Sequence, residues 1–159
     1  MTRKEQYNQL ILQIAGLIKD ETNLVGILAN VSAALHDAFP ERFFWVGFYL
    51  QENGNMLRLG PFQGSVACYV IPFGKGVCGK AWEEERTLIV PDVEKFPGHI
   101  ACSSLSRSEI VVPMYDDSHT FRGVLDIDST RLNDFNEDDK EGLERIIKLL
   151  MTETHDLFQ

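Results

Sequence analysis

The middle of this chain consists of short runs of residues with high strand propensity, and a sequence typical of a hairpin turn connects the first two runs. The first two runs are separated by QENGN (51–55), whose Asn-Gly pair is typical of a tight hairpin turn. Strands joined by such a turn pair antiparallel. We therefore expect roughly six strands in one antiparallel sheet, formed by FFWVGFYL (43–50), MLRLGPFQ (56–63), CYVIPF (68–73), TLIV (87–90), EIVVPMY (109–115) and TFRGVLDID (120–128).

Amphipathic helices are predicted at both ends of the chain. A second helical pattern, over Asn23–Phe39, follows the N-terminal one and stops at Pro40, and GVCGKAWEEE (76–85) predicts a short central helix. Asn136 can cap a C-terminal helix whose first turn is acidic. Strands flanked by terminal helices favour an α+β fold with those helices packed together on one face. The apolar helix positions are Leu10, Ile14, Leu17 and Ile18 at one end, and Leu143, Ile146, Ile147 and Leu150 at the other.

Length and charge limit the classes of protein to which this chain can belong. Its 159 residues suit one domain with a sizeable core, so we expect a single domain over residues 1–159. The net charge of −9 disfavours binding to nucleic acid or to an anionic membrane. The N-terminus reads as an amphipathic helix rather than a secretion signal, so we expect a cytoplasmic protein. Three cysteines are an odd number, which argues against a permanent disulfide framework.

Glycines at Gly74, Gly76 and Gly79 follow a predicted strand and open a predicted helix, as in a dinucleotide-binding fingerprint. That fingerprint needs a βαβ unit with a parallel partner strand, whereas the other strands of this chain are predicted to pair antiparallel. Tight backbone turns explain the glycines better. The four histidines are scattered, and Cys68 and Cys78 are too far apart for a zinc knuckle, so we expect no metal site. The one pair with a spacing that a metal could use is His99 and Cys102, three residues apart.

Acidic residues on the last predicted strand form a candidate site. Asp126 and Asp128 are two residues apart, so both point to the face opposite Leu125 and Ile127. A solvated sheet face is the simplest interpretation. If Glu109 joins them in a partly dry pocket, however, at least one pKa rises and a proton becomes available at neutral pH. Three such acids would also suit a small cation, such as the ammonium group of an amino acid.

Trp45 and Tyr49 are four residues apart in a strand and therefore share a face, either as core packing or as the wall of a small apolar pocket. The cysteines also allow two interpretations. They are three unrelated buried thiols, or they perform redox chemistry in which a sulfenic acid is resolved to a disulfide. Cys68 starts a strand, Cys78 lies in a glycine-rich turn and Cys102 lies in a serine-rich loop, positions that are flexible for core cysteines.

Three long stretches resemble the free methionine-(R)-sulfoxide reductases, which are small GAF-domain enzymes. These stretches are GPFQGSVACYVIPFGKGVCGKAW, VPDVEKFPGHIACSSLSRSEIVVP and GVLDIDS. The resemblance covers roughly residues 40–135. It is specific because GAF domains in general lack three cysteines spaced by ten and twenty-four residues, as here at 68, 78 and 102.

The resemblance implies a role for each candidate residue. Cys102 would take the sulfoxide oxygen and Cys68 would be the resolving thiol, with Cys78 as an alternative resolver or a relay. The acids would hold the substrate and assist at its oxygen, and the aromatic pair would face its methyl-sulfur end. Thioredoxin would be the reductant, with no cofactor, and the terminal helices make a homodimer plausible. The residues implied are Trp45, Tyr49, Cys68, Cys78, Cys102, Glu109, Asp126 and Asp128.

A second function class is a GAF sensor of a small ligand, such as a cyclic nucleotide or a bilin. A chromophore would need a single reactive cysteine, and this chain has three. Absorbance of the purified protein above about 300 nm would distinguish a bilin-binding sensor from a colourless enzyme.

Overall fold

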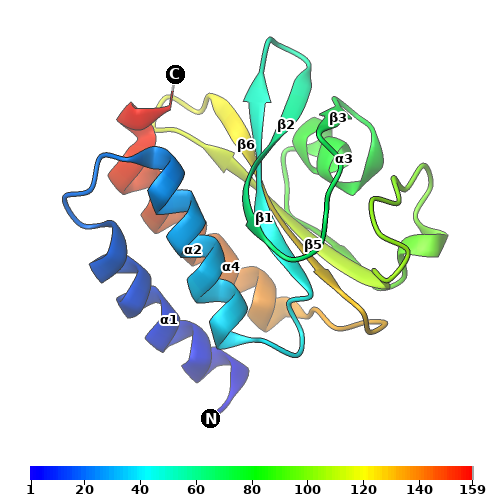
Figure 1. Ribbon diagram of the computed structural model, residues 1–159, viewed down its shortest axis with the longest axis horizontal. Helices are drawn as coiled ribbons and strands as arrows, with labels where there is room; N and C mark the ends of the chain where they lie inside the picture. The colour runs from blue at the N-terminus through cyan, green and yellow to red at the C-terminus, as the bar shows by residue number, and fades with distance from the viewer. Residues whose placement is uncertain (159) are drawn as a thin grey trace.

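Six strands form one antiparallel sheet in the computed structural model, which describes residues 1–158 (Figure 1). The strand order is β3-β2-β1-β6-β5-β4, so the two short strands lie at the edges. Asn53 and Gly54 both have positive φ, as the predicted Asn-Gly hairpin requires. The predicted sheet is confirmed, with β1 (Trp45–Glu52), β2 (Met56–Gln63), β3 (Val70–Pro72), β4 (Leu88–Val90), β5 (Ser108–Tyr115) and β6 (Phe121–Ser129).

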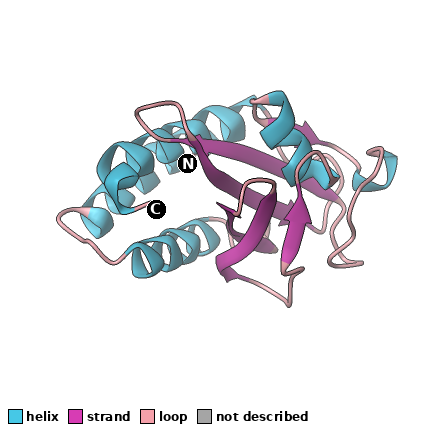
Figure 2. Ribbon diagram, turned by 90° about the horizontal axis from the view of Figure 1, so that it is seen from above, coloured by secondary structure: helices cyan, strands magenta, loops and turns pink. Residues whose placement is uncertain are grey.

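Two helices, α2 and α4, pack on one face of the sheet, α1 packs on these two, and α3 lies on the other face (Figures 1 and 2). Asn136 caps α4 in a capping box with Asp139, and the predicted apolar face of α4 is buried. In α1, Leu17 is an exception to the predicted apolar face because it is 40% exposed, and Tyr7 is buried instead. The helices are α1 (Arg3–Ile18), α2 (Leu24–Ala38), α3 (Gly76–Glu84) and α4 (Glu137–Thr154), with short 3₁₀ turns η1 (Val93–Lys95) and η2 (His155–Leu157).

The sheet separates two apolar clusters. Val46 and Phe48 of β1, with Leu125 and Ile127 of β6, face α2 and α4 in the larger cluster, which residues of α1 complete. Alternate residues of the same strands point the other way, toward α3 and the long loops that precede β3 and β5. The helical face supplies most of the core, which leaves the opposite face free to form a site.

The glycine motif before and within α3 has a backbone explanation. Gly74 and Gly76 have φ values of 74° and 62°, and a Cβ on Gly79 would lie 2.6 Å from the carbonyl oxygen of Pro72. The strand before α3 pairs antiparallel with β2, so the motif does not belong to a βαβ unit. The interpretation as tight turns is confirmed.

Within residues 1–158, no helix combines the length and the apolar character needed to cross a membrane.

Candidate active site

The register of β1, β6 and β5 brings three of the sequence-predicted site residues into one row. Trp45 of β1 is opposite Asp128 of β6, and Asp128 is opposite Glu109 of β5. In a neighbouring row, Asp126 is opposite Gly47 of β1. Residues that are opposite one another project from the same face of a sheet. The acids and the tryptophan therefore meet on the face that the helical layer leaves open.

Burial raises the pKa of all three carboxyl groups. Desolvation is the main cause for Glu109 and for Asp128, and the nearby charge of Asp126 raises both pKa values further. The pKa of Asp126 is also raised by desolvation, but its contacts with Glu109 and Cys78 oppose that rise. All three carboxyl groups therefore hold their protons to higher pH than an exposed carboxyl group does.

Asp126 is the acid that most clearly lacks a partner. Its side chain is 6% exposed, and its Oδ1 atom is buried with no hydrogen-bond partner among residues 1–158. Glu109 is 5% exposed, whereas Asp128 is partly exposed toward the cavity. A buried carboxylate oxygen without a partner is costly. This atom is suited to a cationic or hydrogen-donating ligand.

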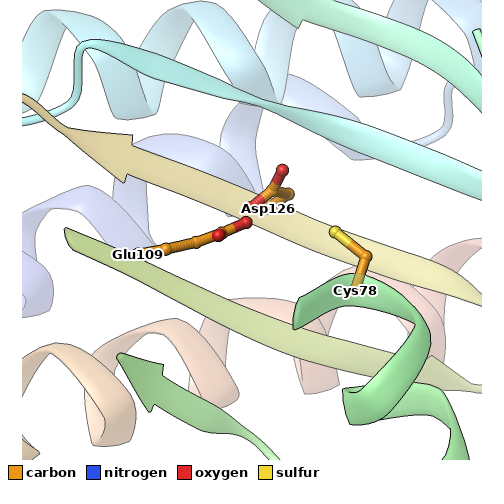
Figure 3. A group of neighbouring side chains, drawn as sticks. All are labelled: Cys78, Glu109 and Asp126. Atoms are coloured by element: carbon orange, nitrogen blue, oxygen red, sulfur yellow. The ribbon is translucent and has the colours of Figure 1, made fainter. Parts of the chain in front are cut away.

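Cys78 corrects one expectation drawn from the sequence. It does not lie in a flexible turn but in the first part of α3, where it is 3% exposed. Figure 3 shows its thiol on α3 facing Glu109 and Asp126 on the sheet. Desolvation is the main cause that raises the pKa of the Cys78 thiol, and the charge of Asp126 adds to it. The thiol is therefore neutral and a poor nucleophile.

The same three side chains are the group in residues 1–158 whose potential metal-ligand atoms converge. The Cys78 sulfur and one oxygen each of Glu109 and Asp126 lie within 4.8 Å of one another. A thiol and two carboxylates are ligands that zinc accepts. The convergence of two carboxyl groups equally suits an ammonium ion.

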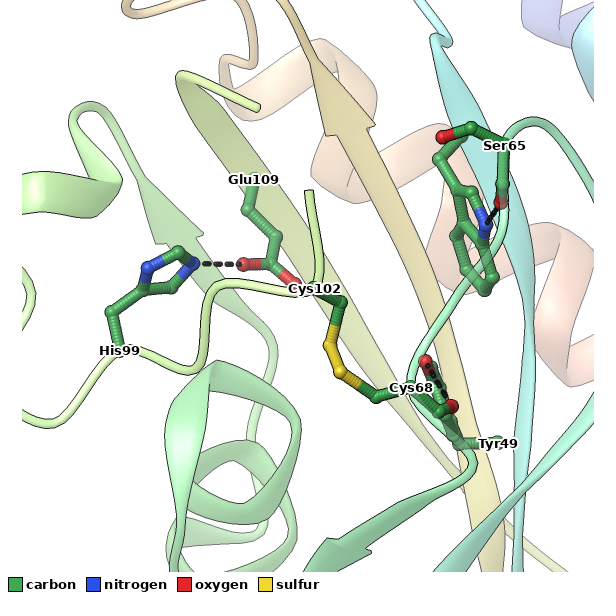
Figure 4. The surroundings of a disulfide bond; sticks show 7 residues. Tyr49, Ser65, Cys68, His99, Cys102 and Glu109 are labelled. Atoms are coloured by element: carbon green, nitrogen blue, oxygen red, sulfur yellow. Dashed lines mark hydrogen bonds and ion pairs between the residues drawn. A yellow bond between two sulfur atoms is a disulfide. The ribbon is translucent and has the colours of Figure 1, made fainter. Parts of the chain in front are cut away.

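Cys68 and Cys102 are joined by a disulfide at the mouth of the cavity (Figure 4). Their Cα atoms are 5.4 Å apart, although 34 positions separate them in the sequence. Cys68 precedes β3 by two residues, rather than starting it, and Cys102 lies in the serine-rich loop before β5, as expected. Both residues are half-buried, so both are more accessible than Cys78.

The predicted aromatic wall is present. Trp45 and Tyr49 are stacked with ring centres 5.8 Å apart, and both line the cavity. Tyr49 donates a hydrogen bond to the carbonyl of Cys68 at 3.1 Å, which ties the aromatic wall to the disulfide. A Cβ on Gly47 would lie 2.9 Å from the Trp45 ring, so the glycine makes room for the indole.

His99 is a site residue that the sequence analysis did not assign. Its Nε2 atom lies 3.8 Å from Oε1 of Glu109, and both side chains are largely buried. Burial lowers the pKa of His99, which favours the neutral ring. Its position three residues before Cys102, on the same loop, was the available signal.

The cavity is small in this disulfide-bonded state. All but one of the predicted site residues line it, and the exception, Cys68, is bonded to Cys102. Its free volume is about 40 Å³, room for about three water molecules at roughly 10–15 Å³ each. A ligand the size of an amino acid therefore requires the loop that carries Cys102 to move.

Comparisons with known proteins agree with this geometry. The GAF domain family matches residues 21–151. The chain is 58% identical over 149 residues to the GAF domain-containing protein A of Dictyostelium discoideum, covering 94% of this chain and 92% of that protein. It is 44% identical over 155 residues to the free methionine-R-sulfoxide reductase of Saccharomyces cerevisiae, covering 94% and 86%.

A solved structure is similar over nearly the whole fold. It is the free methionine-R-sulfoxide reductase of Neisseria meningitidis in complex with its substrate, with a TM-score of 0.93 and 47% sequence identity. The match covers 98% of this chain and 92% of that one.

Proposed function

This chain belongs to the GAF-domain family as one of its free methionine-R-sulfoxide reductases, and we propose that it works through a sulfenic acid on Cys102 and a disulfide with Cys68. The observation that carries the proposal is the Cys68–Cys102 disulfide at the mouth of a cavity lined by carboxyl groups. Residues 1–159 act as one GAF domain in this proposal.

The first step transfers the sulfoxide oxygen to Cys102. The Cys102 thiolate attacks the sulfoxide, the S–O bond of the substrate breaks as its oxygen becomes bonded to the Cys102 sulfur, and one proton is taken up. Two electrons pass to the substrate sulfur, and the products are methionine and a Cys102 sulfenic acid. The sulfoxide is a poor electrophile until its oxygen is protonated or hydrogen-bonded. Glu109 suits this task because its pKa is raised and its carboxyl lies within the cavity.

The second step forms the disulfide and releases water. The Cys68 thiol attacks the sulfur of the sulfenic acid, the S–S bond forms, and the S–O bond breaks with loss of one water. Cys68 is favoured over Cys78 as the resolving thiol for two reasons. It is already bonded to Cys102, whereas Cys78 is buried with a raised pKa. Cys78 then assists by contact with Asp126 rather than by attack.

Substrate binding uses the two chemical characters of the cavity. Asp126 and Asp128 receive the ammonium group of the free amino acid, which supplies the cation that Asp126 lacks. Trp45 and Tyr49 form the apolar wall against the methyl-sulfur end. A peptide-bound methionine sulfoxide has no ammonium group and adds bulk, so it is rejected.

The remaining components of the cycle are proposals of the same kind. Thioredoxin reduces the disulfide, which requires a reducing compartment such as the cytoplasm. The chain forms a homodimer through its terminal helices, in keeping with the exposure of Leu12 and Leu17 on α1.

Serine variants of the three cysteines test the proposal. Pre-reduced Cys102→Ser releases no methionine even in a single turnover, because a serine hydroxyl is far less nucleophilic than a thiolate. Pre-reduced Cys68→Ser still releases about one methionine per site but loses turnover with thioredoxin. Cys78→Ser keeps both the burst and the Cys68–Cys102 disulfide, which mass spectrometry detects after alkylation.

Separated substrates complete the test. Free methionine-(R)-sulfoxide is consumed, while its (S) epimer and the N-acetylated form are not. A stoichiometric burst from Cys102→Ser would show that another residue is the nucleophile. Comparable kcat/KM for the N-acetylated substrate would contradict the ammonium site.

A further inference from the structure

The two segments that meet at the disulfide contain no charged residue. Residues 60–74 carry Cys68 and residues 96–106 carry Cys102, and neither segment includes Asp, Glu, Lys or Arg. Charged residues make up 25% of the whole chain, and its net charge is −9. His99, the titratable side chain of the second segment apart from Cys102, is turned toward Glu109. The two segments that carry the disulfide are therefore neutral on a strongly acidic protein.

These neutral segments also expose large apolar side chains. Val66 is 87% exposed and Tyr69 is 76% exposed, and these residues lie two positions before and one after Cys68. Leu105, three positions after Cys102, is 59% exposed. The disulfide holds the two segments together, with Cα atoms 5.4 Å apart (Figure 4), so these exposed residues lie within three sequence positions of one or other end of a half-exposed S–S bond.

Such a surface has the composition of a protein interface rather than of ordinary solvent-exposed loops. The centres of interfaces are depleted in charged residues and enriched in aromatic ones. Exposed apolar patches bordered by polar residues mark interaction sites. Serines at Ser65 and Ser104 add neutral polar groups to the same segments.

We propose that Val66, Tyr69 and Leu105 form the docking surface for the dithiol protein that reduces the Cys68–Cys102 disulfide. This inference rests on the function proposed above. The occupant follows from the chemistry of the surface, because thiol–disulfide exchange requires the partner's sulfur to contact the S–S bond directly. A partner of the same charge sign as this chain is repelled by its acidic surface but not by this neutral one.

The exchange consumes the partner's two thiols. One partner thiolate attacks a sulfur of the Cys68–Cys102 bond, which forms a mixed disulfide and releases the other cysteine as a thiolate that takes up a proton. The partner's second thiol then breaks the mixed disulfide. The enzyme gains two electrons and two protons, and the partner leaves as a disulfide.

Tyr69→Glu and Leu105→Glu test the surface, because neither side chain lines the cavity. We expect kcat/KM for thioredoxin, regenerated by its reductase and NADPH, to fall by about tenfold or more in each variant. Turnover supported by dithiothreitol should stay within about twofold of wild type, since a small dithiol needs no docking surface. Val25→Glu is the matched control, because Val25 is 68% exposed at the start of α2, on the other side of the sheet.

Three other results are informative. Unchanged kcat/KM for thioredoxin in both variants, with normal dithiothreitol activity, would overturn the docking surface and leave the proposed function intact. A raised KM for methionine sulfoxide with dithiothreitol would mean that these residues cover the substrate instead, which also overturns it. A wild-type protein inactive with both reductants would refute the proposed function itself. If a glutamate variant unfolds, as judged by circular dichroism, Tyr69→Ser and Leu105→Ser make the same test.

Discussion

Two groups of buried acids lie on opposite sides of the sheet, and their surroundings differ. In the helical layer, Asp139 of α4 is fully buried but has several partners. Arg3 and Arg42 form ion pairs with it at 2.8 and 3.1 Å, and Tyr7 donates a hydrogen bond at 2.6 Å. The backbone N–H of Asn136 donates another. The negative charge of Asp139 is therefore balanced by groups in direct contact with it.

In the cavity, Glu109, Asp126 and Asp128 face one another and a neutral thiol instead. Among residues 1–158, His99 is the basic side chain that lines the cavity, and its lowered pKa favours the neutral ring. The pKa of each acid is raised, mainly by desolvation. These carboxyl groups therefore gain little electrostatic stabilisation from one another, and burial deprives them of hydration.

The difference separates a structural role from a binding role. A buried charge that is paired on all sides holds α1, α4 and the chain before β1 together. A buried group of acids that lacks a cation is poised to receive one from a ligand. In the proposed function that cation is the substrate's ammonium group.

Asp139→Asn should show the largest effect. It leaves Arg42 buried with one fewer counter-charge and weakens the α4 cap, so the free energy of unfolding should fall by about 3–5 kcal/mol. Urea denaturation measures this change. Asp126→Asn is the same chemical change in the cavity, and it should leave stability unchanged or raise it, because no cation loses a partner. An equal decrease in the free energy of unfolding of both variants would contradict the distinction between a structural and a binding role for these acids.

Glu109→Gln should have the next largest effect, on catalysis rather than on stability. It keeps the side-chain shape but removes the proton that assists the sulfoxide oxygen, so methionine formation with dithiothreitol should slow by about 10²-fold or more. The exposed Glu94→Gln is the matched control and should behave as wild type. A pH–rate profile that is the same in Glu109→Gln and wild type would contradict the role of this acid.

The sequence predicted the acids because a strand has a fixed alternation. Residues two positions apart in a strand must share a face, and Leu125 and Ile127 identified the face that packs on the helices. The row Trp45–Asp128–Glu109 could not be predicted from the sequence, because it depends on the register of three strands. The resemblance to a family, and not the strand pattern, supplied their assignment to one site.

Cys78 and His99 illustrate what local patterns miss. The predicted helix over 76–85 is confirmed by α3, but the glycines around Cys78 wrongly indicated a flexible position. Gly79 packs closely on the carbonyl of Pro72, and Cys78 is buried. His99 carries no periodic signal, because it lies in an irregular loop. Its contact with Glu109 arises from the path of that loop over the sheet.

The smallest expected effect is on the pH dependence of stability without substrate. The pKa of Glu109 is raised in the folded protein above its ordinary value of 4.5. Between the unfolded and folded pKa values the folded state holds a proton that the unfolded state has lost. This contribution therefore stabilises the protein below the unfolded pKa and is lost as the pH rises through the folded pKa.

Asp116 provides the opposite sign for comparison. The backbone N–H of Thr120 donates to it and is the main cause that lowers its pKa from 3.8, so its contribution is present above that value and is lost as the pH falls. Glu109→Gln should therefore flatten the decline of stability between about pH 5 and 6, where one proton accounts for at most about 1.4 kcal/mol per pH unit. Asp116→Asn should leave that interval unchanged and alter the profile only below about pH 4. Urea denaturation at each pH measures both. If Glu109→Gln instead steepens the decline of stability, the Glu109 carboxyl group is stabilised as an anion in the folded state. The cavity would then already contain a positive partner for Glu109, contrary to the contrast drawn above with Asp139.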